Sequence, residues 1–232
     1  MSQGDRPVAV VTGANRGIGL EVVRQLAGDG FRAILGSRDE SRGAAAAERL
    51  GVDVEVRHLD VADPASVDAF GAGLEGDYDR LDVLVNNAAT HYDTWQRGAT
   101  ADLDVVREAL ETNLLGAWRT TQVCLPLLRR AGGARVVNVS SGAGALTDMG
   151  GGTPGYRVSK TALNALTKIL AAELRGDGIL VNSVCPGWVA TDMGGPGGRP
   201  VEEGAASVMW AVRLGEDGPT GGFFRDGRRI DW

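Results

Sequence analysis

A tyrosine and a lysine stand four positions apart in "PGYRVSKTALNAL", residues 154–166, at the predicted start of a helix. Residues at i and i+4 share one helix face, about 6 Å apart along the axis. An ammonium group this close lowers the pKa of a phenol, ~10 when unperturbed, so Tyr156 and Lys160 could form a proton-transfer pair. The spacing also suits a ring packed on an alkyl stem. Of 24 lysines and arginines only Lys160 and Lys168 are lysines, so lysine at 160 needs a specific explanation.

A glycine-rich turn, "TGANRGIGLEVV", follows the first apolar run of the chain. Gly13, Gly17 and Gly19 have the spacing G-x-x-x-G-x-G, at a point where a strand leads into a helix. Such a turn lets the backbone approach a pyrophosphate and directs the helix N-terminus at it. Glycine-rich turns also close strands for purely structural reasons, but this position favours a dinucleotide site.

The end of the second apolar run, "ILGSRD", bears on which dinucleotide would bind. A carboxylate at this point usually meets a free ribose 2′-hydroxyl, whereas an arginine meets a 2′-phosphate. Ser37 and Arg38 end this run and Arg16 lies in the glycine turn, so two guanidinium groups favour NADP(H) over NAD. Asp39 keeps NAD open, and Arg38 could also simply begin a solvated helix.

Short β-branched runs alternate along the chain with segments of helical periodicity. Most runs are too apolar to face water on either side, which is typical of parallel sheets. They span 7–12, 31–36, 53–58, 81–86, 135–140 and 179–184. Asp63 before Pro64 is a helix N-cap signal. The pattern predicts one α/β domain over 1–232, a doubly wound Rossmann-type fold with a parallel sheet flanked by helices on both faces. The dinucleotide-binding part would span about 1–135 and the catalytic and substrate part about 136–232.

Composition excludes several classes of function. The 232-residue chain has a net charge of −6 and an isoelectric point near 5.0, so it offers no basic field for nucleic acid or an anionic membrane. Its apolar runs fall far short of the ~20 residues that span a bilayer, and we expect a cytoplasmic protein. Cys124 and Cys185 lie in apolar settings typical of buried reduced thiols. His58 and His91 lack companion ligands, so no metal site is expected.

Several motifs occur along the chain in a characteristic order. They are "TGANRGIG" at 12–19, "LDV" at 59–61, "NNAA" at 86–89, "ETNLLG" at 111–116, "VVNVSS" at 136–141, "YRVSK" at 156–160 and "CPGWVATDM" at 185–193. This order resembles the short-chain dehydrogenase/reductase family over nearly the whole chain. Within that family, "CPGWVATDM", "PVEEGAA" and "GGFFRDGRRIDW" are most similar to the NADPH-dependent carbonyl reductases.

The resemblance implies a catalytic tetrad. Tyr156 would donate a proton to a carbonyl oxygen while the nicotinamide delivers hydride to the carbon. Lys160 would lower the pKa of Tyr156 and bind the nicotinamide ribose. Ser141 would hydrogen-bond the substrate oxygen, and Asn113 would hold a water that links Lys160 to solvent. The leading interpretation is therefore an NADPH-dependent reductase of ketones, aldehydes or quinones. The alternatives are an NAD-linked alcohol dehydrogenase and a non-catalytic NADP-sensing module on the same fold.

The same resemblance implies the cofactor-binding residues. Those for the phosphates are Gly13, Asn15, Arg16, Gly17, Ile18 and Gly19. Those for the 2′-phosphate are Ser37 and Arg38, and those around adenine are Asp60 and Val61. Those for the ribose and nicotinamide are Asn87, Ala88, Tyr156, Lys160, Pro186, Gly187, Val189 and Thr191.

Two departures from the family affect what can be inferred. Its "NNAG" reads "NNAA" here, so Ala89 adds a methyl group where the backbone usually approaches the cofactor. The animal carbonyl reductases carry a long insertion between serine and tyrosine that this chain lacks. Without it the helices holding Asn113 and Tyr156 have exposed faces, and we expect a homo-oligomer, a dimer or tetramer, acting on a small carbonyl or alcohol.

The glycine-rich run "TDMGGPGGRPVEE", residues 191–203, follows the segment expected near the nicotinamide. Its glycines suit a hinge, and a helix with apolar positions at helical spacing begins at Val201. A flexible span held at both ends is suited to a substrate lid that excludes water. The other interpretation is a disordered connection.

Overall fold

The structure is a computed structural model that describes residues 6–90 and 92–232, and His91 therefore lies outside the described residues. One sheet orders its strands β3-β2-β1-β4-β5-β6-β7-β8. The strands are Val8–Val11 (β1), Arg32–Ser37 (β2), Glu55–His58 (β3), Val83–Asn86 (β4), Arg135–Val139 (β5), Leu180–Val184 (β6), Phe223–Arg225 (β7) and Arg228–Arg229 (β8). All six expected strands are present and parallel, which confirms the doubly wound fold.

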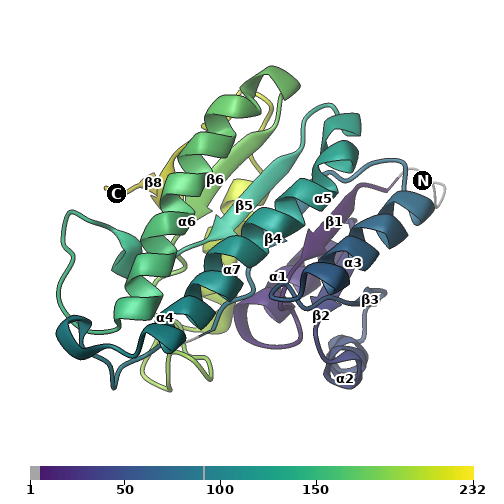
Figure 1. The fold of residues 1–232 in the computed structure, drawn as a ribbon. Helices are drawn as coiled ribbons and strands as arrows, with labels where there is room; N and C mark the ends of the chain where they lie inside the picture. Colours follow the sequence, from purple (N-terminus) through teal and green to yellow (C-terminus); the bar gives the residue numbers. More distant parts are fainter. Residues whose placement is uncertain (1–5, 91) are drawn as a thin grey trace.

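Helices cover both faces of this sheet (Figure 1). They are Gly17–Gly28 (α1), Glu40–Leu50 (α2), Pro64–Asp77 (α3), Leu103–Leu110 (α4), Ala117–Arg130 (α5), Pro154–Glu173 (α6) and Val201–Val212 (α7). A π-helical segment, Glu111–Gly116, joins α4 to α5. Buried side chains of α3, α5 and α6 pack on one face of the sheet, and those of α1, α2 and α7 pack on the other. As predicted, Asp63 caps α3, accepting from the Ala65 amide at 3.0 Å.

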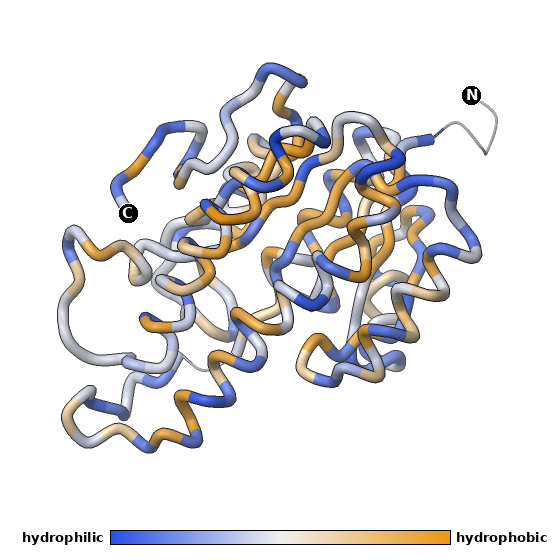
Figure 2. Tube along the Cα trace, turned by 45° about the horizontal axis from the view of Figure 1, so that its top comes forward, coloured by the Kyte–Doolittle hydropathy of each residue, from blue (hydrophilic) through white to orange (hydrophobic). Residues whose placement is uncertain are grey.

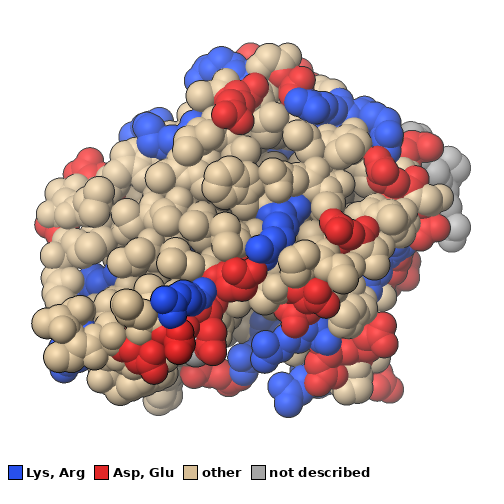
Figure 3. Space-filling view, viewed as in Figure 1, with Lys and Arg blue, Asp and Glu red and all other residues tan. Residues whose placement is uncertain are grey.

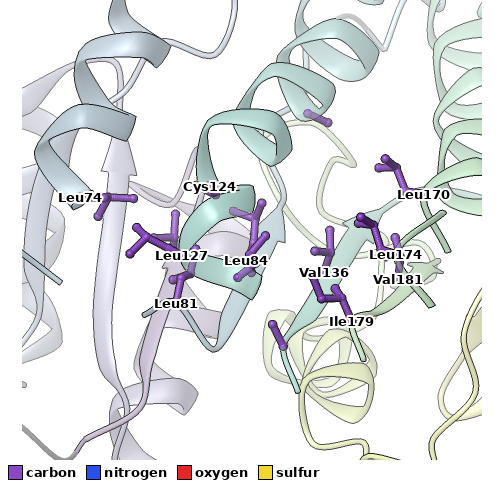
Figure 4. Close-up of a cluster of buried hydrophobic side chains, with 14 of the residues drawn as sticks. Leu74, Leu81, Leu84, Cys124, Leu127, Val136, Leu170, Leu174, Ile179 and Val181 are labelled. Atoms are coloured by element: carbon purple, nitrogen blue, oxygen red, sulfur yellow. The ribbon is translucent and has the colours of Figure 1, made fainter. Parts of the chain in front are cut away.

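Alternate residues of each strand enter different cores, as the period of two requires. In β1, Val8 and Val10 belong to the core beneath α3, α5 and α6, while Ala9 and Val11 belong to the core beneath α1 and α7. Figure 2 shows the hydrophobic stretches gathered along the central strands and inner helix faces. Figure 4 shows part of the first core, where leucines and valines of the sheet meet those of the covering helices. This packing fixes the positions of the carboxyl ends of the strands, where the candidate site lies.

A chain of buried polar side chains ties α6 to the sheet. The Asn86 amide donates to Asn138 Oδ1 at 2.9 Å, and the Asn138 amide donates to Thr167 Oγ1 on α6 at 2.8 Å. Thr167 also shares a hydrogen bond with Ser183 of β6, at 2.8 Å. Buried polar groups cost free energy unless they are paired, so these contacts define the position of α6, the helix that carries Tyr156 and Lys160.

The strands β7 and β8 were not among the expected elements. They have three residues and two residues, too short for a periodic pattern. The strand β7 runs parallel to β6, and β8 turns back antiparallel to β7, so the sheet is parallel except at this edge. None of the described helices is long and apolar enough to cross a membrane.

Candidate active site

The glycine turn after β1 is built as a close-packed cradle. Gly13 and Gly17 have φ of +61° and +55°, a region that side chains disfavour. A β-carbon on Gly19 would lie 2.4 Å from Asn87 Nδ2, so a side chain cannot be added there without displacing Asn87. The N-cap of α1, Arg16, makes no side-chain capping bond, and the first amides of α1 therefore remain for a ligand. The turn fits a pyrophosphate.

Two adjoining cavities lie beside this turn, at the carboxyl ends of the strands, with volumes of about 340 Å³ and 160 Å³. Most of the expected cofactor residues line one or both. The first is lined by Gly13, Arg16, Gly17, Ile18, Gly19, Asn87, Tyr156, Lys160, Pro186 and Thr191. The second is lined by Gly13, Asn15, Arg16, Arg38, Asp60, Val61 and Ala88. Together they form an extended groove that fits a dinucleotide.

Three arginines line the smaller cavity, and two of them are ion-paired: Arg16 Nη1 donates to Asp192 Oδ2 at 2.7 Å, and Arg42 Nε lies 3.2 Å from Asp39 Oδ2. Arg16 and Arg38 line the smaller cavity as expected, and so does Arg42, which the sequence did not single out. Ser37 differs from expectation: it is 1% exposed, its hydroxyl donates to the Asp39 carbonyl at 2.7 Å, and it does not line the cavity. The Asp39 carboxylate caps α2, accepting from the Arg42 amide at 3.0 Å.

Tyr156 and Lys160 lie in the first two turns of α6 and are both buried. Lys160 Nζ is 5.8 Å from the centre of the Tyr156 ring and donates to the Val139 carbonyl at 2.8 Å. Ser141 lies close enough to Tyr156 for its hydroxyl to lower the pKa of the phenol. Tyr92 packs edge-on against the Tyr156 ring, with centroids 5.1 Å apart. The structure thus brings three of the four tetrad side chains to one point.

The protonation of this cluster differs from the sequence expectation. Burial raises the pKa of Tyr156 to about 12, and the hydrogen bond from Ser141 lowers it by less. Burial also lowers the pKa of Lys160 from 10.5 to about 8, because desolvation disfavours the ammonium. The expected lowering of the Tyr156 pKa by Lys160 is therefore not found in this state, where desolvation dominates. A phenol that stays protonated at neutral pH is still a proton donor.

Asn113 lies in the π-helical segment and lines none of the cavities described above. Its amide group donates to Ser159 Oγ at 2.9 Å and to the Thr90 carbonyl at 3.1 Å, and its Oδ1 accepts from the Thr90 amide at 2.8 Å. The side chain thus connects the loop after β4 to α6, one residue before Lys160. Its expected role with a water stays a prediction.

Asp93 is a positioning residue that sequence reasoning missed. It is fully buried, and its carboxylate accepts from the amides of Gly155 and Tyr156 at 2.9 and 3.1 Å. The N-cap of α6, Thr153, makes no capping bond of its own, so Asp93 caps this helix from a distant loop. No local sequence pattern indicates this cap, because Asp93 and Gly155 are 62 residues apart in the sequence.

The substitution in "NNAA" is accommodated without strain. Among the described residues other than glycine, only Thr153 and Asp226 have positive φ, so Ala89 has an ordinary backbone conformation. Its side chain lines the groove. The methyl group therefore forms part of the groove wall.

A third cavity of about 360 Å³ opens beside Tyr156 and Ser141. One wall comes from the segment 186–194 and includes Pro186, Gly187 and Val189, so Gly187 and Val189 face this cavity and not the groove. Cys185, buried with a free thiol, also lines it. Because Tyr156 borders both this cavity and the groove, it stands where a second reactant would meet a bound dinucleotide.

Comparisons with known proteins agree with this geometry. The sequence matches the short chain dehydrogenase family over residues 7–199. It is 35% identical to a (+)-neomenthol dehydrogenase of Arabidopsis thaliana, over 93% of this chain and 95% of that protein. It is also 35% identical to carbonyl reductase (NADPH) 1 of Sus scrofa, over 97% and 94%. An NADPH-bound carbonyl reductase from chicken fatty liver superposes with a TM-score of 0.86 at 30% identity, covering 98% of this chain and 100% of the other. The chain belongs to the short-chain dehydrogenase family.

The alignment with the Sus scrofa protein also bears on the missing insertion. It extends over 279 positions, whereas this chain has 232 residues, so that relative contains residues with no counterpart here. The substrate cavity must therefore be understood from the residues of this chain.

Proposed function

We propose that this protein is an NADPH-dependent reductase that converts a ketone, aldehyde or quinone to an alcohol. The observation that carries the proposal is the position of Tyr156, whose side chain borders both the dinucleotide groove and the third cavity. A carbonyl compound in that cavity would have its oxygen at the hydroxyls of Tyr156 and Ser141. The similarity to carbonyl reductases whose names include NADPH supports the same reaction and cofactor.

Each side chain of the tetrad has a defined task in this reaction. NADPH, when bound, supplies the hydride. Tyr156 donates its hydroxyl proton to the carbonyl oxygen as negative charge develops there, and Ser141 donates a second hydrogen bond to that oxygen. Lys160 supplies positive charge beneath the pair, and Asn113 holds α6 in place through Ser159. Burial excludes water from the proton transfer.

The preference for NADPH rests on Arg38, which lines the smaller cavity together with Arg16 and Arg42. Asp39, the residue that kept NAD open in the sequence, lines the same cavity, but its carboxylate caps α2 and lies 3.2 Å from Arg42 Nε. The NAD-linked alcohol dehydrogenase is therefore the weaker candidate. The presence of all four tetrad residues argues against a sensor without catalysis.

The test follows NADPH absorbance with a panel of ketones, aldehydes and quinones, and compares NADPH with NADH. We expect kcat/KM to be at least about tenfold higher with NADPH, since hydrogen bonds to charged groups are worth about 1.5–3 kcal/mol. Replacing Arg38 by Leu should reduce this ratio, whereas Arg49→Leu, at the exposed end of α2, should not. Equal efficiency with both cofactors would contradict the assignment.

We further infer that the enzyme works in the cytoplasm as a dimer or tetramer. The first point is supported by Cys124 and Cys185, which are buried free thiols of the kind found in a reducing compartment. The second is supported by exposed apolar side chains on α4, α5 and α6, namely Leu103, Trp118, Val158 and Ile169.

A further inference from the structure

The third cavity has one charged side chain among the described residues that line it, and that side chain is Arg225. The other lining residues are apolar, or carry hydroxyl or thiol groups. A neutral ketone, aldehyde or quinone has no use for a guanidinium group at this position. The cavity therefore contains a feature that the proposed function leaves unexplained.

Arg225 does not form an ion pair within the part of the chain that the structure describes. Its contact with Cys185 is weak: Nη2 lies 3.1 Å from the sulfur, and a thiol is a poor acceptor. Nearby Arg199, by contrast, binds both carboxylate oxygens of Asp226, at 2.9 and 2.8 Å. Arg225 is exposed, so most of its five N–H donors face water and remain available to a ligand that enters the cavity.

The position of Arg225 is also not explained by sheet stability. The register of β7 and β8 pairs Arg225 directly with Arg228, and like charges opposite each other across antiparallel strands are destabilising. Asp226, the adjacent carboxylate, is bound to Arg199. An anion in the cavity would offset the repulsion.

The guanidinium group lies close to the site of proton transfer. A β-carbon on Gly142 would stand 2.8 Å from Arg225 Nη2, so the guanidinium packs on the bare α-carbon of that glycine. The Gly142 amide also donates to the Cys185 sulfur, at 3.1 Å. Ser141, the preceding residue, lines the same cavity as Tyr156 and Arg225, and adjacent α-carbons are about 3.8 Å apart. An anion bound to Arg225 would be only a few bonds from a carbonyl held by Ser141 and Tyr156.

We propose that Arg225 determines the substrate class of this site: a carbonyl compound that also carries a carboxylate a few bonds away, a short-chain oxo acid. The proposal rests on the proposed function, since the carbonyl is placed by Tyr156 and Ser141. Arginine binds a carboxylate through two parallel hydrogen bonds, which orients the ligand as well as holding it. The net charge of −6 gives no long-range attraction for an anion, so selection depends on this local contact.

Two measurements test the proposal on wild type and on Arg225→Gln, which keeps a polar side chain without charge. The first compares kcat/KM for 4-oxopentanoate and 5-oxohexanoate with the values for their methyl esters. The second needs no turnover and compares the binding of hexanoate and hexanamide by calorimetry. Arg228→Gln is the matched control, because it removes a guanidinium from the same strand pair but does not line the cavity.

Wild type should prefer the acids to the esters and hexanoate to hexanamide, and Arg225→Gln should reduce both preferences about tenfold, the size expected for one charge-assisted pair. Activity on the esters should stay within about twofold, and Arg228→Gln should behave as wild type. If Arg225→Gln leaves both preferences unchanged, or if wild type shows neither preference, the proposal is wrong. This holds even if the enzyme converts the esters to alcohols. If no carbonyl compound is reduced, the proposed function fails, while the binding comparison still decides the role of Arg225.

Discussion

Lys160 is held in an environment that opposes its own charge. Its side chain is 2% exposed, and its Nζ donates to the Val139 carbonyl. A carbonyl dipole offsets only part of the desolvation of an ammonium, so burial lowers the pKa from 10.5 to about 8. Such a perturbation beside a phenol in a groove is typical of a catalytic group.

The shift makes stability depend on pH. The folded pKa lies below the unfolded one, so the cost of burying the charge is fully present below about pH 8, decreases as pH rises, and is absent above 10.5. We expect wild type to gain about 3 kcal/mol of unfolding free energy relative to Lys160→Met between pH 7 and pH 10.5, from 1.36 kcal/mol per pKa unit. Tyr156, whose pKa is raised from 10.0 to about 12, makes folding less favourable as pH passes 10, but wild type and Lys160→Met share this contribution.

Urea unfolding at the two pH values measures this difference. Lys168→Met is the control, since Lys168 is exposed on the same helix. A difference between wild type and Lys160→Met that does not change with pH would contradict the lowered pKa.

At the scale of elements, the segment between β6 and α7 is more ordered than its glycines suggested. Bridges pair Val189 with Arg199 and Thr191 with Gly195, and the Trp188 indole donates to the Gly194 carbonyl at 2.7 Å. We call residues 186–200 the flap. If it opens and closes over the third cavity, it moves as a folded unit, with its ends as the hinges.

Gly198 is the position at which this element can be tested. A β-carbon there would lie 2.4 Å from the Val189 carbonyl carbon, so Gly198→Ala must force the two sides of the flap apart. We expect kcat and KM for a carbonyl substrate to change together, with NADPH affinity within a few-fold of wild type. Gly28→Ala is the control, because nothing lies within 4 Å of its added carbon. Kinetics of Gly198→Ala equal to wild type would show that the flap does not act as a lid.

The sequence predicts the strands and helices that are encoded by patterns of neighbouring residues. The apolar runs gave all six central strands, and the Tyr156–Lys160 spacing placed both residues on one helix. Asp93 and Arg225 could not be found this way, because their importance comes from contacts with residues far away in sequence. The orientation of the Ser37 side chain could not be predicted either, because its hydroxyl donates to the carbonyl of Asp39, the N-cap of α2.

At the scale of the whole molecule, charge is distributed unevenly. Figure 3 shows a broad area without charged side chains over α6, whereas acidic and basic groups lie near the centre of the view, over α5, and toward its lower edge. The helix α5 carries Arg119, which is ion-paired with Glu111. Trp118, Val158 and Ile169 are exposed on these helices, at 36%, 49% and 47%. A surface area with few charges and exposed large apolar residues is typical of a protein interface.

This face predicts self-association in solution. Light scattering after size exclusion should give a mass of two or four times 24.2 kDa. Val158→Arg together with Ile169→Glu should shift the protein toward monomer, because charges would be buried at the interface. Lys168→Glu, a charge change that lies between the two on the same helix, should matter less. A monomeric wild type at micromolar concentration would exclude this interface.

The central claim is that Tyr156 delivers the proton to a carbonyl substrate, and Tyr156→Phe tests it most directly because the change removes one hydroxyl. General acid catalysis is typically worth ~10²–10⁴-fold, so kcat for the best carbonyl of the panel should decrease by about that factor. The Kd for NADPH, measured by fluorescence titration, should stay within a few-fold of wild type. Turnover by Tyr156→Phe near the wild-type rate, with NADPH still bound, would contradict the account.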